Sequence, residues 1–109
     1  MTHTIKTLAQ NNPAATTPTD LYTVPASTST IISSIVVCNR GATTSTFRVS
    51  VAVAGAALDV KQYLYFDVLM PPNDTFIATI GITLATTDVI RVYASTTNLT
   101  FNLFGEEIS

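Results

Sequence analysis

The stretch Ser45–Ala54, which reads STFRVSVAVA, alternates large apolar residues with small or polar ones. From Phe47 to Val53, every second residue is phenylalanine or valine. Successive side chains of a strand face opposite ways, so these residues would share one side of an extended chain. β-Branched and aromatic residues also favour strands. This period of two predicts a strand with one buried face.

The same chemistry recurs on both sides of this stretch, with turn-forming residues between the segments. The sequence PPND at residues 71–74 is a strong turn signal, because proline fixes φ while Asn and Asp bond the backbone that follows. No segment keeps a 3.6-residue apolar period over the length of a helix. The predicted strands are Thr4–Leu8, Asp20–Val24, Ser29–Asn39, Ser45–Ala54, Tyr63–Val68, Thr75–Ile80, Asp88–Ser95 and Leu99–Phe104, and Gly81–Thr87 is predicted as a loop whose Ile82 and Leu84 reach into the core.

The number and spacing of these segments predict the fold class. Seven or eight strands at regular spacing indicate an all-β fold, an antiparallel β-sandwich, for which a jelly roll is one topology. A chain of 109 residues fits one domain, since a second hydrophobic core would be too small to stand alone. Residues 19–109 are expected to form that domain. Residues 1–18, with the proline-broken AQNNPAATTP, are predicted to form a strand or arm that contacts a neighbouring subunit.

The composition indicates a subunit of an assembly. Charged residues make up 11% of the chain, against roughly a quarter in an average soluble protein. Hydrophobic residues make up 47%. A small domain keeps a large surface for its volume and cannot hide that much apolar area by itself. We therefore expect part of it to meet another protein surface, including copies of the same chain.

Charge and hydropathy argue against nucleic-acid and membrane partners. The formal net charge is −2, and no two of the five basic residues are adjacent, so nothing draws the chain toward a phosphate backbone. No apolar run approaches the roughly 20 residues needed to span a bilayer. The start of the chain, MTHTIK, lacks the basic-then-apolar order of a secretory signal, so we expect synthesis in a cytoplasm without processing.

Groups capable of catalysis or metal binding are few and scattered. A catalytic triad would have to use His3, the only histidine, close to a chain end that usually frays. Cys38, the only cysteine, continues an apolar run and is expected to be a small buried hydrophobe. One His and one Cys cannot make a structural zinc site within one chain. We expect no enzymatic activity and no metal.

The acidic residues and glycines fit structural roles. Asp20, Asp74 and Asp88 stand at strand starts or turns, where a short carboxylate accepts backbone N–H bonds. No acidic loop has the alternation of a calcium site. The four glycines form no phosphate-binding motif. No cofactor is therefore expected, and a pair of distant acids acting as a hydrolase is the weakest of the possible readings.

A polar and aromatic stripe is predicted on the fifth strand, where Lys61, Tyr63, Tyr65 and Asp67 would share one face. Tyrosine offers apolar area together with a hydroxyl, so Lys61, Tyr63 and Tyr65 are candidate contacts for a neighbouring subunit or a sugar. The alternative is an outer strand face with its hydroxyls in water.

Four stretches together resemble a group of small virion proteins of tailed bacteriophages. They are LYTVPA at 21–26, SIVVCNR at 34–40, DVIRVYAS at 88–95 and FNLFGEEI at 101–108. The similarity runs over most of residues 20–109. It implies a β-sandwich built into the virion, as a capsid decoration (cement) protein or a tail or baseplate component. It also implies a homotrimer, contact with the major capsid protein or other virion proteins, and assembly in the host bacterial cytoplasm. The family has no catalytic residues to carry over.

One further class of function remains open from the residues. The chain could be a receptor- or carbohydrate-binding module that uses Tyr63, Tyr65 and loop tips near Asn73 or Asn98. The absence of tryptophan weighs against it, because sugar platforms use large aromatic faces.

Overall fold

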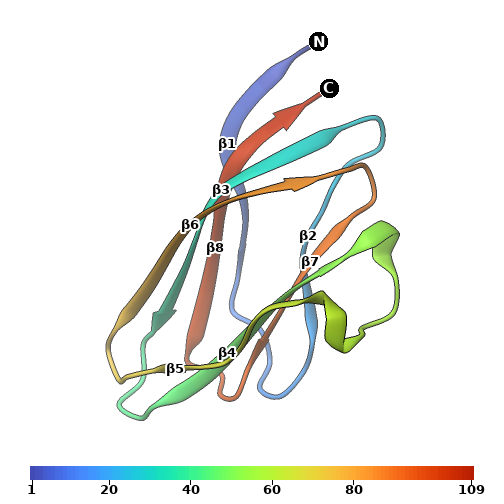
Figure 1. Cartoon of the computed structure of the whole chain (residues 1–109). Helices are drawn as coiled ribbons and strands as arrows, with labels where there is room; N and C mark the ends of the chain where they lie inside the picture. The colour runs from blue at the N-terminus through green and yellow to red at the C-terminus, as the bar shows by residue number, and fades with distance from the viewer.

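The computed structural model describes residues 1–109, and it consists of strands joined by short turns (Figure 1). All eight predicted strands are present. The strands are β1 (His3–Asn11), β2 (Thr19–Thr23), β3 (Ser29–Asn39), β4 (Ser45–Ala52), β5 (Tyr63–Met70), β6 (Thr75–Leu84), β7 (Val89–Ala94) and β8 (Leu99–Ile108), with 3₁₀ turns η1 (Val53–Gly55) and η2 (Val60–Gln62) between β4 and β5.

Two antiparallel sheets of four strands form a sandwich. Sheet A has the order β1-β8-β3-β6 and sheet B the order β2-β7-β4-β5. Consecutive strands alternate between the sheets, except that β4 and β5 are neighbours in sheet B. This order is that of a jelly roll. The predicted antiparallel β-sandwich is confirmed.

The core lies between the sheets and is built by the alternation that the sequence shows. Phe47 and Val49 on β4 are 0% and 1% exposed. Phe101 and Leu103 on β8 face them from sheet A and are equally buried. Fully burying such side chains contributes about 1.5–3 kcal/mol each. Burial of one face per strand is therefore what holds the two sheets together.

Strand β4 ends earlier than predicted. Ala54 and Gly55 have φ of +54° and +71°, which turns the chain away from the sheet. Val53, predicted to share the buried face of Phe47, lies in η1 and is 69% exposed. The alternation itself could not reveal this end, because an apolar residue at the expected spacing fits either a strand or an exposed turn.

Strand β6 continues where a loop was predicted. The chain keeps pairing with β3 through Gly81 to Leu84, with a register shift between the pairs Ile32–Ile82 and Ser34–Thr79. Gly81 has φ of +55°, so the extra residue forms a bulge rather than ending the strand. Leu84 is buried and Ile82 packs against the core, so both predicted anchors are confirmed.

Residues 3–11, within the segment predicted as an arm, form an edge strand of the chain's own sheet. β1 pairs with β8 from His3–Ile108 to Asn11–Phe101. The two chain ends are bonded together, since Thr2 and Ser109 exchange backbone hydrogen bonds of 2.7 and 2.9 Å (Figure 1). None of the β1 residues is fully buried. Contact of this segment with a neighbouring subunit stays a prediction.

Gly105 marks a close approach between β8 and β3. β3 carries an extra residue, Ser33, between the pairs Ile32–Gly105 and Ser34–Phe104, and its hydroxyl donates to the Phe104 carbonyl at 3.1 Å. A Cβ added at Gly105 would overlap the carbonyl oxygen of Ile31. Any larger residue would therefore push β3 and β8 apart.

We expect Gly105→Ala to lower the free energy of unfolding by about 2–4 kcal/mol, because the backbone of β3 cannot move without losing pairing. Chemical denaturation would measure this loss. Gly81→Ala is the matched control, since no atom lies within 4 Å of a Cβ there and only its positive φ is penalised, at about 1–2 kcal/mol. A loss at Gly105 no greater than that at Gly81 would contradict the predicted clash.

Candidate functional site

The three predicted contact residues do not share a face. Tyr63 pairs with Ser50 and Tyr65 with Val49, so β5 holds one residue more than β4 between these pairs. This bulge turns Tyr65, which is half-buried, toward the core, and its ring centroid lies 5.4 Å from that of Phe76. Tyr63 lies on the outer side of sheet B.

Lys61 is not on the strand at all. It lies in η2, exposed, immediately before β5 begins. The prediction of a common stripe was therefore wrong, because a bulge reverses the faces that simple alternation assigns. That Lys61, Tyr63 and Tyr65 contact a partner stays a prediction.

A second bulge builds an arginine–aromatic cluster on the outer face of sheet B. Asp67 has φ of +51° and lies within a register shift between the pairs Phe47–Val68 and Val49–Tyr65. Its carboxylate accepts from Arg48 Nε at 2.6 Å and Nη2 at 3.3 Å. The Arg48 guanidinium carbon lies 4.2 Å from the centroid of the Phe66 ring.

The positive charge of Arg48 is thus paired with groups of the same chain. The ring of Tyr93 lies against it as well, at 4.3 Å, and the bond to Asp67 raises the pKa of Arg48 above its ordinary value. Sequence reasoning missed Arg48. Its alternation with Phe47 and Val49 does place it on the outer face, but its partners on β5 depend on two bulges that no pattern signals.

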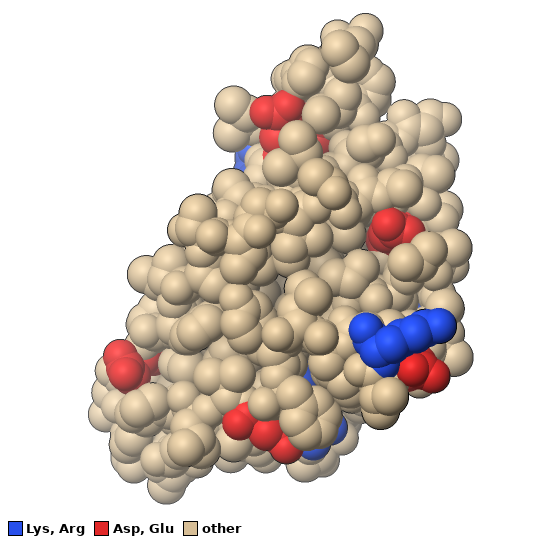
Figure 2. All heavy atoms as spheres, viewed as in Figure 1, with Lys and Arg blue, Asp and Glu red and all other residues tan.

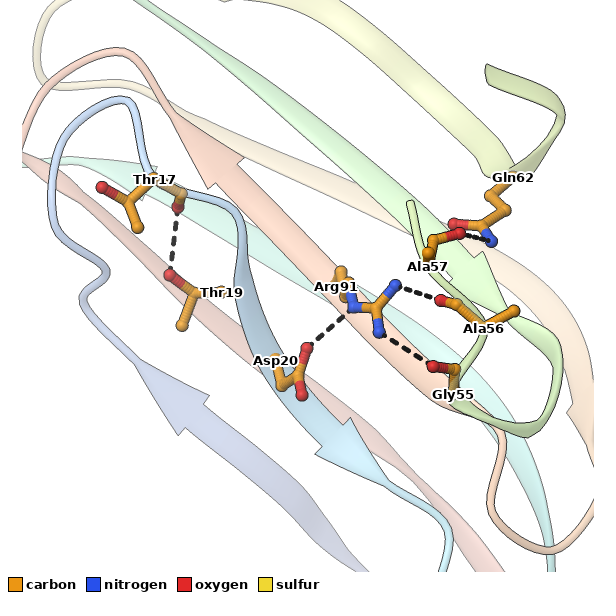
Figure 3. Close-up of polar contacts among 8 residues, drawn as sticks. All are labelled: Thr17, Thr19, Asp20, Gly55, Ala56, Ala57, Gln62 and Arg91. Carbon is orange, nitrogen blue, oxygen red and sulfur yellow. Dashed lines mark hydrogen bonds and ion pairs between the residues drawn. The ribbon is translucent and has the colours of Figure 1, made fainter. Parts of the chain in front are cut away.

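A second arginine binds the segment that leads into β5 (Figure 3). Arg91 on β7 donates to Asp20 on β2 at 2.9 Å and to the carbonyls of Ala56 and Gly55 at 2.6 and 3.3 Å. Gln62 donates to the Ala57 carbonyl at 2.9 Å. Both arginines of this face therefore have partners within the chain.

Exposed apolar side chains are concentrated in the segment of the chain that contains β5. Five of the ten exposed large hydrophobic residues lie within residues 58–69, a concentration that marks this segment as the candidate interaction surface. Leu69 is 68% exposed and Val60 84%. We call the five the β5 apolar surface: Leu58, Val60, Leu64, Phe66 and Leu69.

Charged atoms are sparse over the molecule as Figure 2 shows it. They appear as separate small groups in a mostly uncharged surface. Burying such a surface against a partner removes little hydration from charges, which is the costly part of forming an interface.

The other residues singled out from the sequence have structural partners. Asp88 is buried and accepts from the backbone N–H groups of Ala54 and Ala85, both at 2.9 Å, which confirms its predicted role. Asp20 pairs with Arg91 instead of capping a turn. His3 Nδ1 lies 2.5 Å from a Glu106 oxygen across the β1–β8 pair.

Cys38 is half-buried on β3 rather than fully buried as expected. No three His, Cys, Asp or Glu side chains come together as a metal site would need. Neither helical turn is long and apolar enough to cross a membrane.

A polar network joins the two sheets at the end of the sandwich near the chain termini. Tyr22 on β2 donates to Glu107 on β8 at 2.5 Å, and Lys6 on β1 lies 2.9 Å from the other oxygen of Glu107. The Tyr22 hydroxyl also lies 2.9 Å from that of Thr30. Burial, with the bond to Glu107, raises the pKa of Tyr22 to about 12. The same bond, with Lys6, lowers the pKa of Glu107.

We expect Tyr22→Phe to lower the free energy of unfolding at pH 7 by about 1–3 kcal/mol, because Glu107 loses a donor. Tyr22 stays protonated in the folded protein up to about pH 12. In the unfolded chain it ionises near its ordinary value of about 10, so the parent loses stability between these pH values.

Denaturant titrations at pH 8 to 11.5 would measure this difference. The Tyr22→Phe variant should lose less stability than the parent over the alkaline range. Tyr93→Phe is the matched control, since it keeps the ring against Arg48 and should follow the parent. Parallel curves for Tyr22→Phe and the parent would show that the network does not couple folding to this proton.

The sequence matches no protein-family model, and it matches no curated protein.

Proposed function

We propose that the chain is a non-enzymatic structural subunit of a bacteriophage virion, a capsid decoration (cement) protein that stabilises the particle through subunit contacts. Its partners would be copies of itself and the major capsid protein. The observation that supports this most is the β5 apolar surface, carried on a rigid jelly roll with few charges. The resemblance of four stretches to small phage virion proteins is the reason for proposing a virion as the assembly.

The proposed mechanism is burial of apolar area between subunits. Each Å² removed from water contributes about 25 cal/mol before the costs of association. Phe66 and Leu69 are the most exposed large apolar side chains of β5, at 55% and 68%. Because Arg48 and Arg91 already have partners within the chain, covering this face would bury no unpaired arginine.

The positions of the two tyrosines argue against the alternative of a sugar-binding platform. Such a platform would use Tyr63 and Tyr65 side by side, but Tyr65 packs against Phe47 and Phe76 in the core. A tail or baseplate protein would use the same apolar surface. The two positions are therefore distinguished by locating the subunit in the particle.

Imaging intact virions with an antibody against this chain tests the proposal directly. We expect label on the head at many copies per particle. Label confined to the tail would replace decoration of the capsid by a tail or baseplate role. Purified particles that lack the chain would overturn the proposal.

We expect Leu69→Glu to weaken binding to particles stripped of this subunit by about 10- to 100-fold, because a charge would be buried without a partner. The side chain is 68% exposed, so the fold should survive. Ala26→Glu adds the same charge at an exposed turn and serves as the control. Equal binding of both variants in a pelleting assay would remove the β5 apolar surface from the interface.

We also propose that residues 1–18 contact a neighbouring subunit through the free side of β1. Ile5 on this strand is 83% exposed. Ile5→Thr keeps a β-branched residue in the strand while removing apolar area, so we expect binding to stripped particles to weaken about 3- to 10-fold. Incorporation at the parental level, with an unchanged free energy of unfolding, would contradict this contact.

A further inference from the structure

Strand β6 is a sheet edge without protection. It ends sheet A, so one side of its backbone pairs with β3 and the other has no strand beside it. Its sequence, TFIATIGITL, contains no charged residue and no proline. Natural sheets usually guard such edges with charges, prolines, bulges or short strands, because unpaired backbone groups bind other strands.

The other three edges carry these protections. β1 has Lys6, in an ion pair with Glu107, and His3, which is hydrogen-bonded to Glu106. β2 has only five residues and includes Asp20. β5 contains two bulges, and its Asp67 is paired with Arg48 of β4. In β6 the single bulge at Gly81 leaves the segment Thr75–Ile80 regular.

The regular part of β6 is self-complementary. Residues 75–79 read TFIAT, which has nearly the same pattern in both directions about Ile77. In an antiparallel pair centred on Ile77, each Thr75 would face a Thr79 and the two Ile77 side chains would face each other. β-Branched residues opposite one another stabilise antiparallel pairs.

The remaining side chains fit the same pairing. Each Phe76 would lie opposite an Ala78, which sets a large side chain against a small one on the core side. Ile77 points outward and is 66% exposed. The nearest charge, Asp74, would lie at opposite ends of the paired segment in the two copies, so the carboxylates would not meet. In Figure 2 the broad area around β6, as located in Figure 1, is almost entirely uncharged.

We propose that β6 binds β6 of a second copy of this chain, antiparallel and about a two-fold axis. The two A sheets would then form one continuous sheet across the pair. This deepens the proposed function by naming one of its partners, and it leaves the β5 apolar surface free for the particle. The pairing closes after two copies, whereas the phage resemblance implied three.

The mass of the full chain in solution, measured by sedimentation over a range of concentrations, tests the proposal. We expect a dimer. Ile77→Lys would remove the contact between the two Ile77 side chains and place two like charges opposite each other, so we expect dissociation to be favoured by about 5- to 30-fold. Val53→Lys is the matched control, because Val53 is similarly exposed, at 69%, and lies in η1, outside both proposed contact surfaces. It should leave the dimer intact.

A charge swap makes the test specific for this geometry. An equimolar mixture of Ile77→Lys and Ile77→Glu copies should form a heterodimer, since residue 77 would face its own counterpart. A parent that stays a monomer, a trimer, or a dimer indifferent to Ile77→Lys would each overturn the pairing. A parent monomer that gains mass only with another virion protein would assign β6 to that protein instead.

One further measurement guards against misfolded variants. In a Cys38→Ser background, Ile77→Cys should give a disulfide-linked dimer on a non-reducing gel, whereas Val53→Cys should not. No cross-link from Ile77→Cys would overturn the pairing. These results are independent of where the subunit lies in the virion, so the inference and the proposed function can fail separately.

Discussion

The packing of Phe47 between the two sheets is the contact on which the rest of the structure depends. Its ring lies 6.2 Å from that of Phe101 and 5.2 Å from that of Phe76, both on the opposite sheet. No part of Phe47 is exposed. Every strand except β1 places buried side chains in this one layer, because a domain of this size has room for a single core. Each residue that does not fit the layer must lie outside it.

The bulges decide which apolar residues lie outside. Without the extra residues in β5, strict alternation would put Tyr63 and Tyr65 on one face and Leu64 and Phe66 on the other. The observed register instead keeps Tyr65 in the core and leaves Phe66 on the outer face against Arg48. Leu64, Phe66 and Leu69 are therefore held by the pairing of β5 within the sheet, whereas Leu58 and Val60 lie in the segment before it.

The few charges of the chain serve mainly to hold its own parts together. Arg91 ties β2 and the turn after β4 to β7, while Arg48 and Asp67 neutralise each other on the outer face. Lys6 and Glu107 join β1 to β8 beside Tyr22. Little charge remains to repel a second protein. Strand β6, which lies at a sheet edge, contains no charged residue.

Several features could be predicted from the sequence because they depend on local patterns. The alternation in β4 was enough to predict that Phe47 and Val49 are buried, though not Val51, which is half-buried, or Val53, which is exposed. The PPND turn was enough to separate β5 from β6. Asp88 was correctly assigned to backbone contacts, since a carboxylate beside a strand start seldom has another use. Low charge and high apolar content indicated that apolar area would stay exposed, as it does within residues 58–69. That this area contacts a partner stays a prediction.

The tertiary structure alone decided how these pieces meet. No local pattern signals the bulges at Ser33, Leu64 and Asp67, and Gly81 by itself fits either a loop or a bulge. These bulges set the register, the inward turn of Tyr65 and the length of β6. The partners of Arg48 and Tyr22 come from strands distant in the chain. Periodicity records which side of its own strand a residue faces. Only the pairing of strands determines what lies beside it.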